Sequence, residues 1–390
     1  MYMNIYLYFL YFIFTQKLNS TLNCNYIYIQ KYVNTNMKKV SEALDKNNNI
    51  VICPEDLKGY NHVWKVFLAG PVQGAAEWQF KMPFIDDVVW LSPRRRELVV
   101  KNFDYNEQVE WETHALRMAN VVIFWIPEPA EDVSGRSYAQ TTRFELGENF
   151  ARGKRIIIGA YKGFPGRRYL EYKVSKYKNV IGGVFETIDE CVNCLKEYID
   201  QKPKLYFTSD THFSSERALE LSKRPFTSVE DMDWSMIERW NNTVNPKDTV
   251  WHLGDFGDNW PLDYLSGFVK CIIGNYERDG KTKLDHESLE MTLDGPIRLD
   301  VDETFGDFKG SFILAHEPIA AKEAMDKENK KSGEDLLCLF GHIHGRQRIK
   351  KFGIDVGVDC NNYTPISLDD VNFFMNAIRK GYYDDEVWKQ

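Results

Sequence analysis

The sequence predicts an α/β protein built from two successive domains. Its 390 residues exceed the usual size of a single domain, and its 43% apolar content is enough for packed cores. From residue 62 onward, short apolar strands alternate with amphipathic helices. This alternation is typical of a parallel sheet that is covered by helices on both faces.

Strands and helices can be followed along the first predicted domain, residues 37–202. Short apolar runs predict strands, whereas longer stretches with apolar residues three or four apart predict helices. The predicted strands are 64–70, 121–127 and 155–160, and the predicted helices are 105–119, 141–154 and 191–199. A polar link follows at residues 201–203 and contains a helix-stopping proline. We therefore place the start of the second domain, 203–390, at this link.

Residues 1–36 differ from the rest of the chain. The run MYMNIYLYFLYFIFT is apolar but too short to span a bilayer, and Asn, Tyr and Ile dominate up to residue 36. Met37 then begins MKKVSEALDK, which resembles an ordinary protein start. We expect residues 1–36 to be a low-complexity leader that is disordered or not native. A membrane anchor is the alternative.

Charge and cysteine content restrict the partners and the compartment. The net charge of −8 argues against strong binding of nucleic acid, although a local basic pocket can still accept a nucleotide. The seven cysteines are odd in number and scattered, as in a reduced cytoplasmic protein. We expect a cytoplasmic location, in the host cytoplasm if a phage encodes the chain, and no membrane association.

Five apolar strands of the second domain each end in residues that bind metals. The first, LYFTSDTH, places Asp210 and His212 two apart, where side chains of an extended chain point to the same side. The later endings GDFG, GNYE, AHEP and GHIH add Asp255, Asn275, His316, His342 and His344. Carboxylate, amide and imidazole groups are ligands for divalent metal ions.

These seven candidate ligands suit two cations held close together. Asp255 would bridge the cations, with Asp210 and His212 on one side and Asn275 and His316 on the other. Cations roughly 3.5–4 Å apart can activate a water and stabilise the oxygens of an in-line displacement at phosphorus. The second domain is therefore predicted to hydrolyse a phosphate ester.

The motifs DTH, GD, GNYE, H and GHIH, in this order, resemble the calcineurin-like metallophosphoesterase superfamily over about residues 204–375. The resemblance implies a β-sandwich flanked by helices in four αββα layers. It also implies two divalent transition-metal ions, with Mn²⁺ favoured over Fe, Ni or Zn, and hydrolysis of phosphomonoesters or phosphodiesters.

One departure from this family concerns the catalytic acid. The family usually has a histidine where Tyr276 stands, and a tyrosine, with a pKa near 10, is a poorer acid at neutral pH. Either the substrate has a good leaving group, or another residue such as His252 supplies the proton. His252 can also be a strand histidine that is satisfied by a neighbour.

The first domain offers a candidate nucleophile. The turn Gly70-Pro71 follows a predicted strand, and ligands of parallel sheets bind at the carboxyl ends of strands. The segment FELG places Glu145 at a helix start near the same edge. A carboxylate there can attack an anomeric carbon, as in retaining glycosidases. The alternative is a solvated glutamate in a first helical turn.

Five segments resemble the phage and bacterial branch of the nucleoside 2-deoxyribosyltransferase-like family over about residues 62–185. They are LAGP, SPRR, EQVEWE, ANVVIFW and FELG. The resemblance implies a flavodoxin-like sheet, with Glu145 as the nucleophile and Glu112 as the residue that handles the base and its proton. Gly70 and Pro71 match the loop that lines the base pocket.

At other positions the match to this family is less direct. Asp132 is a candidate for a second sugar-binding aspartate in a long loop, 128–143. Asn120 replaces an aspartate of the family, and we expect it to be structural. Arg94 and Arg95 could contact a phosphate, which suits a nucleotide substrate, or they could form a solvated basic turn.

The two halves together predict a bifunctional enzyme of nucleotide metabolism. One site would break or exchange an N-glycosidic bond of a nucleoside or nucleotide, and the other would hydrolyse a phosphate ester. A homo-oligomer is compatible with this prediction, because the transferase relatives complete their sites across subunits. The alternatives are a phosphoesterase whose first domain only binds a nucleotide, and a non-catalytic nucleotide sensor or sponge.

Overall fold

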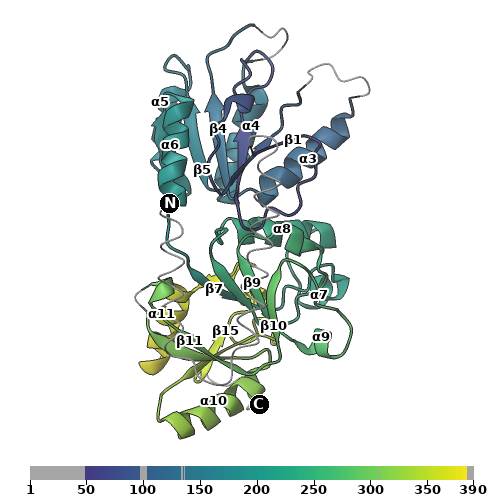
Figure 1. The fold of residues 1–390 in the computed structure, drawn as a ribbon, viewed down its shortest axis with the longest axis vertical. Coiled ribbons are helices and arrows are strands. Elements are labelled where there is room, and N and C mark those ends of the chain that lie inside the picture. The colour runs from purple at the N-terminus through teal and green to yellow at the C-terminus, as the bar shows by residue number, and fades with distance from the viewer. Residues whose placement is uncertain (1–48, 97–102, 133–134, 136, 307, 384–390) are drawn as a thin grey trace, which may run out of the picture. The chain divides into compact units, whose positions relative to one another are not determined.

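A computed structural model describes residues 49–96, 103–132, 135, 137–306 and 308–383 (Figure 1). The predicted leader, residues 1–36, lies outside the described residues. Among the described helices, none combines the length and the apolar character that a membrane crossing requires.

The first sheet is parallel throughout. Its order is β1-β3-β2-β4-β5-β6, and without the edge strand β1 this is the doubly wound 2-1-3-4-5 order. The strands are β1 (Ile50–Ile52), β2 (Trp64–Ala69), β3 (Val88–Ser92), β4 (Val121–Ile126), β5 (Ile156–Ala160) and β6 (Val180–Phe185). Every residue of β2, β4 and β5 is buried, as their continuous apolar runs predict.

Helices cover this sheet, which confirms the predicted parallel α/β arrangement. They are α3 (Tyr105–Met118), α4 (Gln140–Arg152), α5 (Arg167–Val174) and α6 (Ile188–Ile199), with a 3-10 turn η1 (Gln79–Lys81). Helix α4 ends at Arg152, close to the predicted 154, because the following Gly153 adopts a left-handed φ of 72°. Helix α6 starts three residues earlier than predicted, since Thr187 and Glu190 form a capping box.

Two five-stranded sheets follow after β6. One has the order β10-β9-β8-β7-β16 and the other β11-β12-β13-β15-β14. The first contains β7 (Leu205–Thr208), β8 (Thr249–His252), β9 (Phe268–Ile272), β10 (Leu289–Leu293) and β16 (Ile366–Ser367). The second contains β11 (Ile297–Val301), β12 (Gly310–Leu314), β13 (Leu337–Phe340), β14 (Ile349–Lys350) and β15 (Gly353–Asp355).

These two sheets pack face to face between outer helices. Phe207 and Leu253 of one side share a core with Leu314 and Leu339 of the other. Helix α8 (Val229–Asn241) covers the free face of the first sheet, and α10 (Pro318–Ser332) covers that of the second. The order of layers is therefore helix, sheet, sheet, helix. The other helical segments are α7 (Glu216–Leu221), α9 (Asn275–Arg278), α11 (Leu368–Arg379), η2 (Trp260–Asp263), η3 (Glu303–Phe305) and η4 (Val358–Cys360).

A buried amide connects the first sheet with the segments around α8. Asn120 is fully buried, and its Nδ2 donates to Ser266 Oγ over 2.9 Å and to the Asn241 carbonyl over 3.2 Å. Its Oδ1 accepts from the backbone N–H of Lys65 over 3.0 Å. An aspartate could not donate both of these bonds, so the asparagine suits this position.

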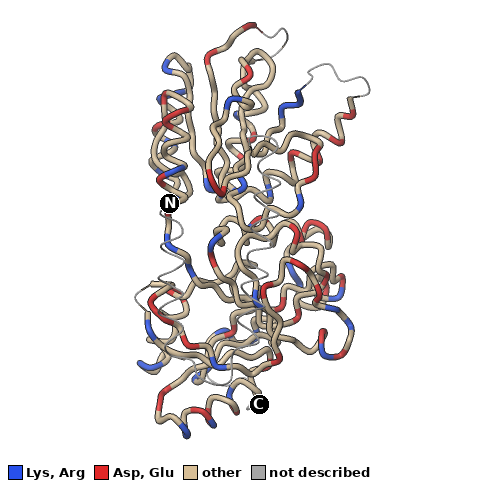
Figure 2. The backbone as a smooth tube through the Cα atoms, viewed as in Figure 1, with Lys and Arg blue, Asp and Glu red and all other residues tan. Residues whose placement is uncertain are grey.

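Charged side chains of both signs are interspersed along the chain (Figure 2), whose formal net charge is −8. Basic residues that line a site are therefore local features of a mixed surface.

Candidate functional site

Six of the seven predicted metal ligands lie in loops just after strands, and the seventh, Asn275, is the first residue of α9. Asp210 and His212 follow β7, Asp255 follows β8 and Asn275 follows β9. These three strands are parallel neighbours, so their carboxyl ends lie at the same edge. In the second sheet, His316 follows β12, and His342 and His344 follow the parallel neighbour β13.

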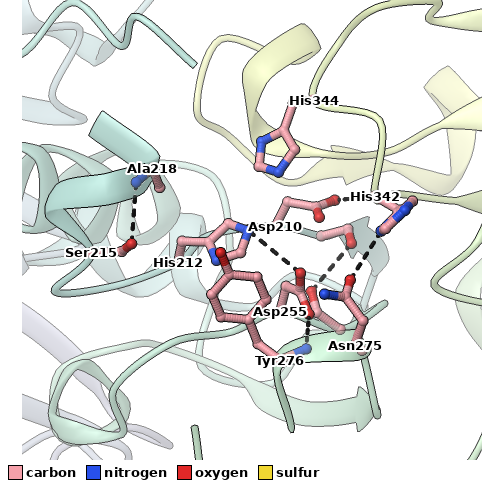
Figure 3. A network of polar contacts seen from close by, with 12 residues as sticks. Asp210, His212, Ser215, Ala218, Asp255, Asn275, Tyr276, His342 and His344 are labelled. Carbon is pink, nitrogen blue, oxygen red and sulfur yellow. Dashed lines mark hydrogen bonds and ion pairs between the residues drawn. The ribbon is translucent and has the colours of Figure 1, made fainter. Parts of the chain in front are cut away.

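The structure brings all seven side chains into one cluster, part of which Figure 3 shows. Two sets of three side chains each have ligand atoms within 4.8 Å of one another: Asp210 with His212 and His344, and Asp210 with Asp255 and His316. Asn275 contacts the second set through His316, whose Nε2 lies 2.9 Å from Asn275 Oδ1. His342 is connected through Asn275, since His342 Nδ1 lies 3.0 Å from the same oxygen.

Two aspartates connect the halves of this cluster. Asp210 belongs to both sets of three. Asp255 Oδ2 lies 3.5 Å from His212 Nε2 and 3.4 Å from His316 Nε2. Asp255, the predicted bridging ligand, thus lies close to one histidine of each set of three. Asp210, which belongs to both sets, is a second candidate for the bridging role.

The backbone at the cluster is left-handed at five of the seven residues. The φ angles are 58° at Asp210, 48° at His212, 56° at Asp255, 72° at His342 and 48° at His344. Each such residue costs on the order of 1–3 kcal/mol, and conformations of this kind concentrate at functional sites. The surrounding structure therefore holds the ligand loops in place.

The reason given above for pairing Asp210 with His212 is wrong. Strand β7 ends at Thr208, and both residues have positive φ, so they do not share one side of an extended chain. Left-handed φ angles at the alternate positions 210 and 212 turn the loop instead, and the two side chains converge by that route. The same correction applies to His342 and His344.

Small residues leave room for the carboxylates. A Cβ at Gly341 would collide with Ser209 Oγ and Asp210 Oδ2, and a Cβ at Gly274 would collide with Asp255 Oδ1. Glycine is required at both positions because the carboxylate oxygens occupy the space of a side chain.

Hydrogen bonds fix two of the imidazoles in a metal-binding form. Nδ1 of His316 donates to the Leu253 carbonyl over 2.9 Å, and Nδ1 of His344 donates to Asp359 Oδ2 over 2.8 Å. Nε2 is then the atom of each ring that would bind a cation, which is the usual arrangement of metal-binding histidines. His316 Nε2 itself lies 2.9 Å from Asn275 Oδ1 and 3.4 Å from Asp255 Oδ2.

The electrostatics of the cluster also suit a cation. Although burial opposes it, the hydrogen bond with His316 lowers the pKa of Asp255 to about 2. Asp210 Oδ1 and His212 Nε2 are buried and have no hydrogen-bond partner. Burying a polar atom without a hydrogen-bond partner lowers the stability of the fold, and a bound metal ion would provide the missing partner. The residues therefore fit the two divalent ions that the sequence predicts.

A glutamate that the sequence analysis overlooked holds two ligand loops together. Glu277 Oε2 accepts from the N–H groups of Asp255 and Gly274 over 2.9 and 2.8 Å, and Oε1 accepts from Phe256 over 2.9 Å. Its position in GNYE, two residues after Asn275, is the signal that could have identified it.

The two candidate acids occupy different surroundings. The Tyr276 ring meets the His212 ring edge-on, with centroids 4.8 Å apart, so it borders the cluster directly. His252 is fully buried, with its Nε2 2.9 Å from Thr211 Oγ1. Burial lowers the pKa of His252 to about 3. His252 thus has a protein partner and no contact with solvent, whereas Tyr276 is partly exposed.

A second site lies at the carboxyl edge of the first sheet. A cavity of about 660 Å³ opens there. Six predicted residues line it: Gly70, Pro71, Arg94, Arg95, Glu112 and Glu145. Asp132 does not line it and is exposed. The sequence of the 128–143 segment gives no signal that Asp132 lies outside the lining of the cavity.

Both carboxyl groups of the cavity have raised pKa values, chiefly because they are buried. Burial, followed by the charges of Glu112 and Glu148, raises the pKa of Glu145 to about 7. Burial also raises the pKa of Glu112, although its hydrogen bond from Gln108 Nε2, 2.7 Å long, opposes the rise. Glu145 is partly buried in the second turn of α4, which corrects the alternative of a solvated first-turn glutamate.

The cavity also contains two guanidinium groups. Arg94 is only 3% exposed, so it is not a solvated side chain; its Nη2 lies 3.3 Å from Glu77 Oε1, and its Nε has no partner. Arg95 pairs with Glu107 at 2.7 Å and donates through Nε to Gln108 Oε1 over 2.8 Å. Two arginines and two glutamates therefore line the same space.

Comparisons with known proteins identify relatives of the chain. Residues 63–164 match the family model described as nucleoside 2-deoxyribosyltransferase like, so the chain contains a domain of that class. The chain belongs to the same family as the uncharacterized protein MJ1445 of Methanocaldococcus jannaschii. It is 30% identical to that protein over 193 residues, which cover 46% of this chain and 93% of the relative.

Two further similarities were found. The gene 66 protein of Mycobacterium phage D29 is 25% identical over 209 residues, covering 45% of this chain and 98% of that protein. The crystal structure of AQ665, a protein of unknown function from Aquifex aeolicus, is 24% identical and has a TM-score of 0.35. That match covers 44% of this chain and 98% of the solved chain. The resemblance of the first domain to the transferase-like family is thus confirmed for residues 63–164.

Proposed function

We propose that the chain is a bifunctional enzyme of nucleotide metabolism. The cluster around Asp210 and Asp255 would hydrolyse a phosphate ester, and the cavity at Glu145 would cleave an N-glycosidic bond or transfer a deoxyribosyl group. The convergence of seven metal-binding side chains from five separate loops carries the first assignment. The similarity to calcineurin-like metallophosphoesterases in the order of these motifs supports it.

The chain's own residues define what the phosphoesterase site would do. Asp210, His212, Asp255, Asn275, His316, His342 and His344 would hold two divalent ions, with Mn²⁺ favoured and Fe, Ni or Zn as alternatives. When bound, such ions supply Lewis-acid stabilisation of a phosphoryl group and lower the pKa of water. Tyr276, at the border of the cluster, can donate a hydrogen bond to the departing oxygen.

Metal content and product analysis test this assignment. The full chain would be purified with its native metal, and its metal content measured. It would then be assayed against nucleotides, cyclic nucleotides and dinucleotides, with phosphate release and free base followed separately. We expect close to two transition-metal ions per chain and loss of phosphate release, but not of base release, after chelation. A chain without bound metal would favour the nucleotide sensor.

One observation supports the proposed cleavage of an N-glycosidic bond, or transfer of a deoxyribosyl group, in the cavity at Glu145. Two coupled carboxyl groups lie in it within the segment that matches the transferase-like family. Ionised Glu145 would form a bond to the anomeric carbon while the C–N bond breaks and its electron pair moves to the base. Protonated Glu112 would deliver a proton to the base. Water or a second base would then take the sugar from Glu145.

A pair of glutamate variants tests this step. Glu145→Ala is expected to abolish base release, because the nucleophile is lost. Glu148→Ala removes an exposed glutamate from the same helix and is the matched control, expected to keep base release. Base release that persists in Glu145→Ala would exclude glycosidic chemistry at this residue. The first domain would then be a nucleotide-binding domain beside a phosphoesterase.

A further inference from the structure

A buried ion pair lies directly behind one half of the metal cluster. Arg224 is 4% exposed, and its Nε and Nη2 lie 2.9 and 3.0 Å from the two carboxylate oxygens of Asp359. Two-pronged pairs of this kind fix both position and orientation. The partners stand 135 positions apart in the sequence, so the pair joins a loop after α7 to the η4 turn.

The same guanidinium also holds the loop that carries Asp210 and His212. Its Nη2 donates to the Asp210 carbonyl over 2.6 Å, and its Nη1 donates to the Thr211 carbonyl over 2.7 Å. These carbonyls belong to the segment with left-handed φ angles at Asp210 and His212. Arg224 thus supplies hydrogen bonds that favour the strained turn over an extended chain.

Asp359 continues the connection on the opposite side. Its Oδ2 accepts from Nδ1 of His344 over 2.8 Å, and Ser222 Oγ lies 3.1 Å from the same nitrogen. The bond keeps the proton on Nδ1 and leaves the Nε2 lone pair for a ligand. The Tyr363 ring packs over the Arg224 guanidinium, 5.9 Å from its centroid, and helps to shield the pair from water.

We propose that Arg224 and Asp359 are positioning residues that preassemble the half of the metal centre formed by Asp210, His212 and His344. The inference rests on the proposed metal-binding function. The other half has supports of its own, since Glu277 holds the Asp255 loop and the Leu253 carbonyl orients His316. Loss of the ion pair should therefore weaken one of two bound ions more than the other.

Metal titration of the full chain tests this asymmetry. Metal-free wild type and Asp359→Asn would be titrated with Mn²⁺ by calorimetry. In the variant we expect one of two binding events to weaken by about 10–100-fold, the usual effect of losing a partner behind a metal ligand, and the other to change little. Glu238→Gln is the control, because Glu238 is a similarly buried carboxylate that pairs with Arg152 instead.

A second measurement needs no metal. In ¹⁵N-histidine spectra of the metal-free chain at alkaline pH, His344 should be protonated on Nδ1 in wild type and in Glu238→Gln. Asp359→Asn should shift it toward the other tautomer, because the carboxylate acceptor is gone. A purely structural role of Asp359 would leave the tautomer unchanged.

The outcomes separate this inference from the function on which it rests. Wild type that binds no Mn²⁺ would remove the proposed metal function, and the positioning role with it. Wild type that binds two ions, together with unchanged or equally weakened binding of both in Asp359→Asn, would overturn the positioning role alone. If Asp359→Asn does not fold, Arg224→Lys replaces it. This variant keeps the charge but loses the two-pronged geometry, and unchanged binding of both ions there would also overturn the proposal.

Discussion

The two candidate sites are built in opposite ways. In the cluster of candidate metal ligands, two sets of three side chains each have ligand atoms within 4.8 Å of one another, and left-handed backbone and hydrogen bonds hold them there. The cavity at Glu145 is an open space of about 660 Å³ whose walls come from the end of strand β2, from helices and from turns. The cluster holds its side-chain atoms close enough to surround a single small ion, whereas the cavity offers a volume of the size that a small-molecule substrate would fill.

The carboxylates show the same contrast. The hydrogen bond with His316 outweighs burial and lowers the pKa of Asp255 to about 2. Burial and two neighbouring glutamates raise the pKa of Glu145 to about 7. The same chemical group is therefore kept charged in one site and close to half-protonated in the other, which is how one chain can support two chemistries.

The largest expected effect separates the two sites. Asp255→Asn removes a central charge of the metal cluster, so phosphate release should fall by about 10³-fold, corresponding to several kcal/mol of transition-state stabilisation. Base release should be unchanged, because the cavity does not include this residue. Both products would be followed in the same reaction. Normal phosphate turnover in this variant would refute the assignment of Asp255.

A pH series on Glu145→Gln sharpens the electrostatic contrast. The pKa of Glu145 rises from 4.5 to about 7 in the folded chain. The folded state therefore holds the proton longer than the unfolded state does, and wild type loses stability as the pH rises through this window. Glu145→Gln should be more stable than wild type above pH 7, by up to about 3 kcal/mol, and this gain should vanish near pH 4.5.

Urea unfolding at several pH values measures this gain. Glu128→Gln, which removes an exposed glutamate that neither lines the cavity nor lies in α4, is the control. A difference between Glu145→Gln and wild type that does not vary with pH would contradict the raised pKa.

A pair of glycine variants compares the packing of the two sites. In Gly341→Ala the new methyl group collides with Asp210 Oδ2, so the free energy of unfolding should fall by about 1–3 kcal/mol. Gly147→Ala, in the helix that carries Glu145, meets nothing within 4 Å. It should raise stability by up to about 1 kcal/mol. Denaturant unfolding measures both changes, and equal effects of the two variants would mean that the metal cluster is not tightly packed.

The smallest expected effect concerns Asp132. The residue is exposed and does not line the cavity, so Asp132→Ala should change the activation free energy of base release by less than about 0.5 kcal/mol. Initial rates at low nucleoside or nucleotide concentration would show this. A large loss would mean that the loop reaches the substrate when it binds.

Much of the fold followed from local patterns. The strands β2, β4 and β5 are continuous apolar runs, and their burial on both faces leaves little choice other than a parallel sheet. The ligand residues could be chosen because each directly follows a strand. Their left-handed backbone could not be predicted, since loops with non-glycine residues at positive φ have no simple sequence signature.

Long-range partners were the part that sequence reasoning could not supply. Arg224 and Asp359 belong to no short motif, and only the folded chain brings them together across 135 positions. Asp132 does not line the cavity, and its role stays a prediction, because the path of a long loop depends on tertiary contacts that a spacing argument does not contain.

The left-handed ligand loops have a consequence for mutational scanning. Alanine fits that backbone region less well than glycine or asparagine, by roughly 1 kcal/mol. An alanine at His212 or His344 would thus remove a metal-binding nitrogen and also destabilise the loop that carries it. A measured loss of activity would then combine both effects. Asparagine or glycine replacements there would give the cleaner measure of what each imidazole contributes.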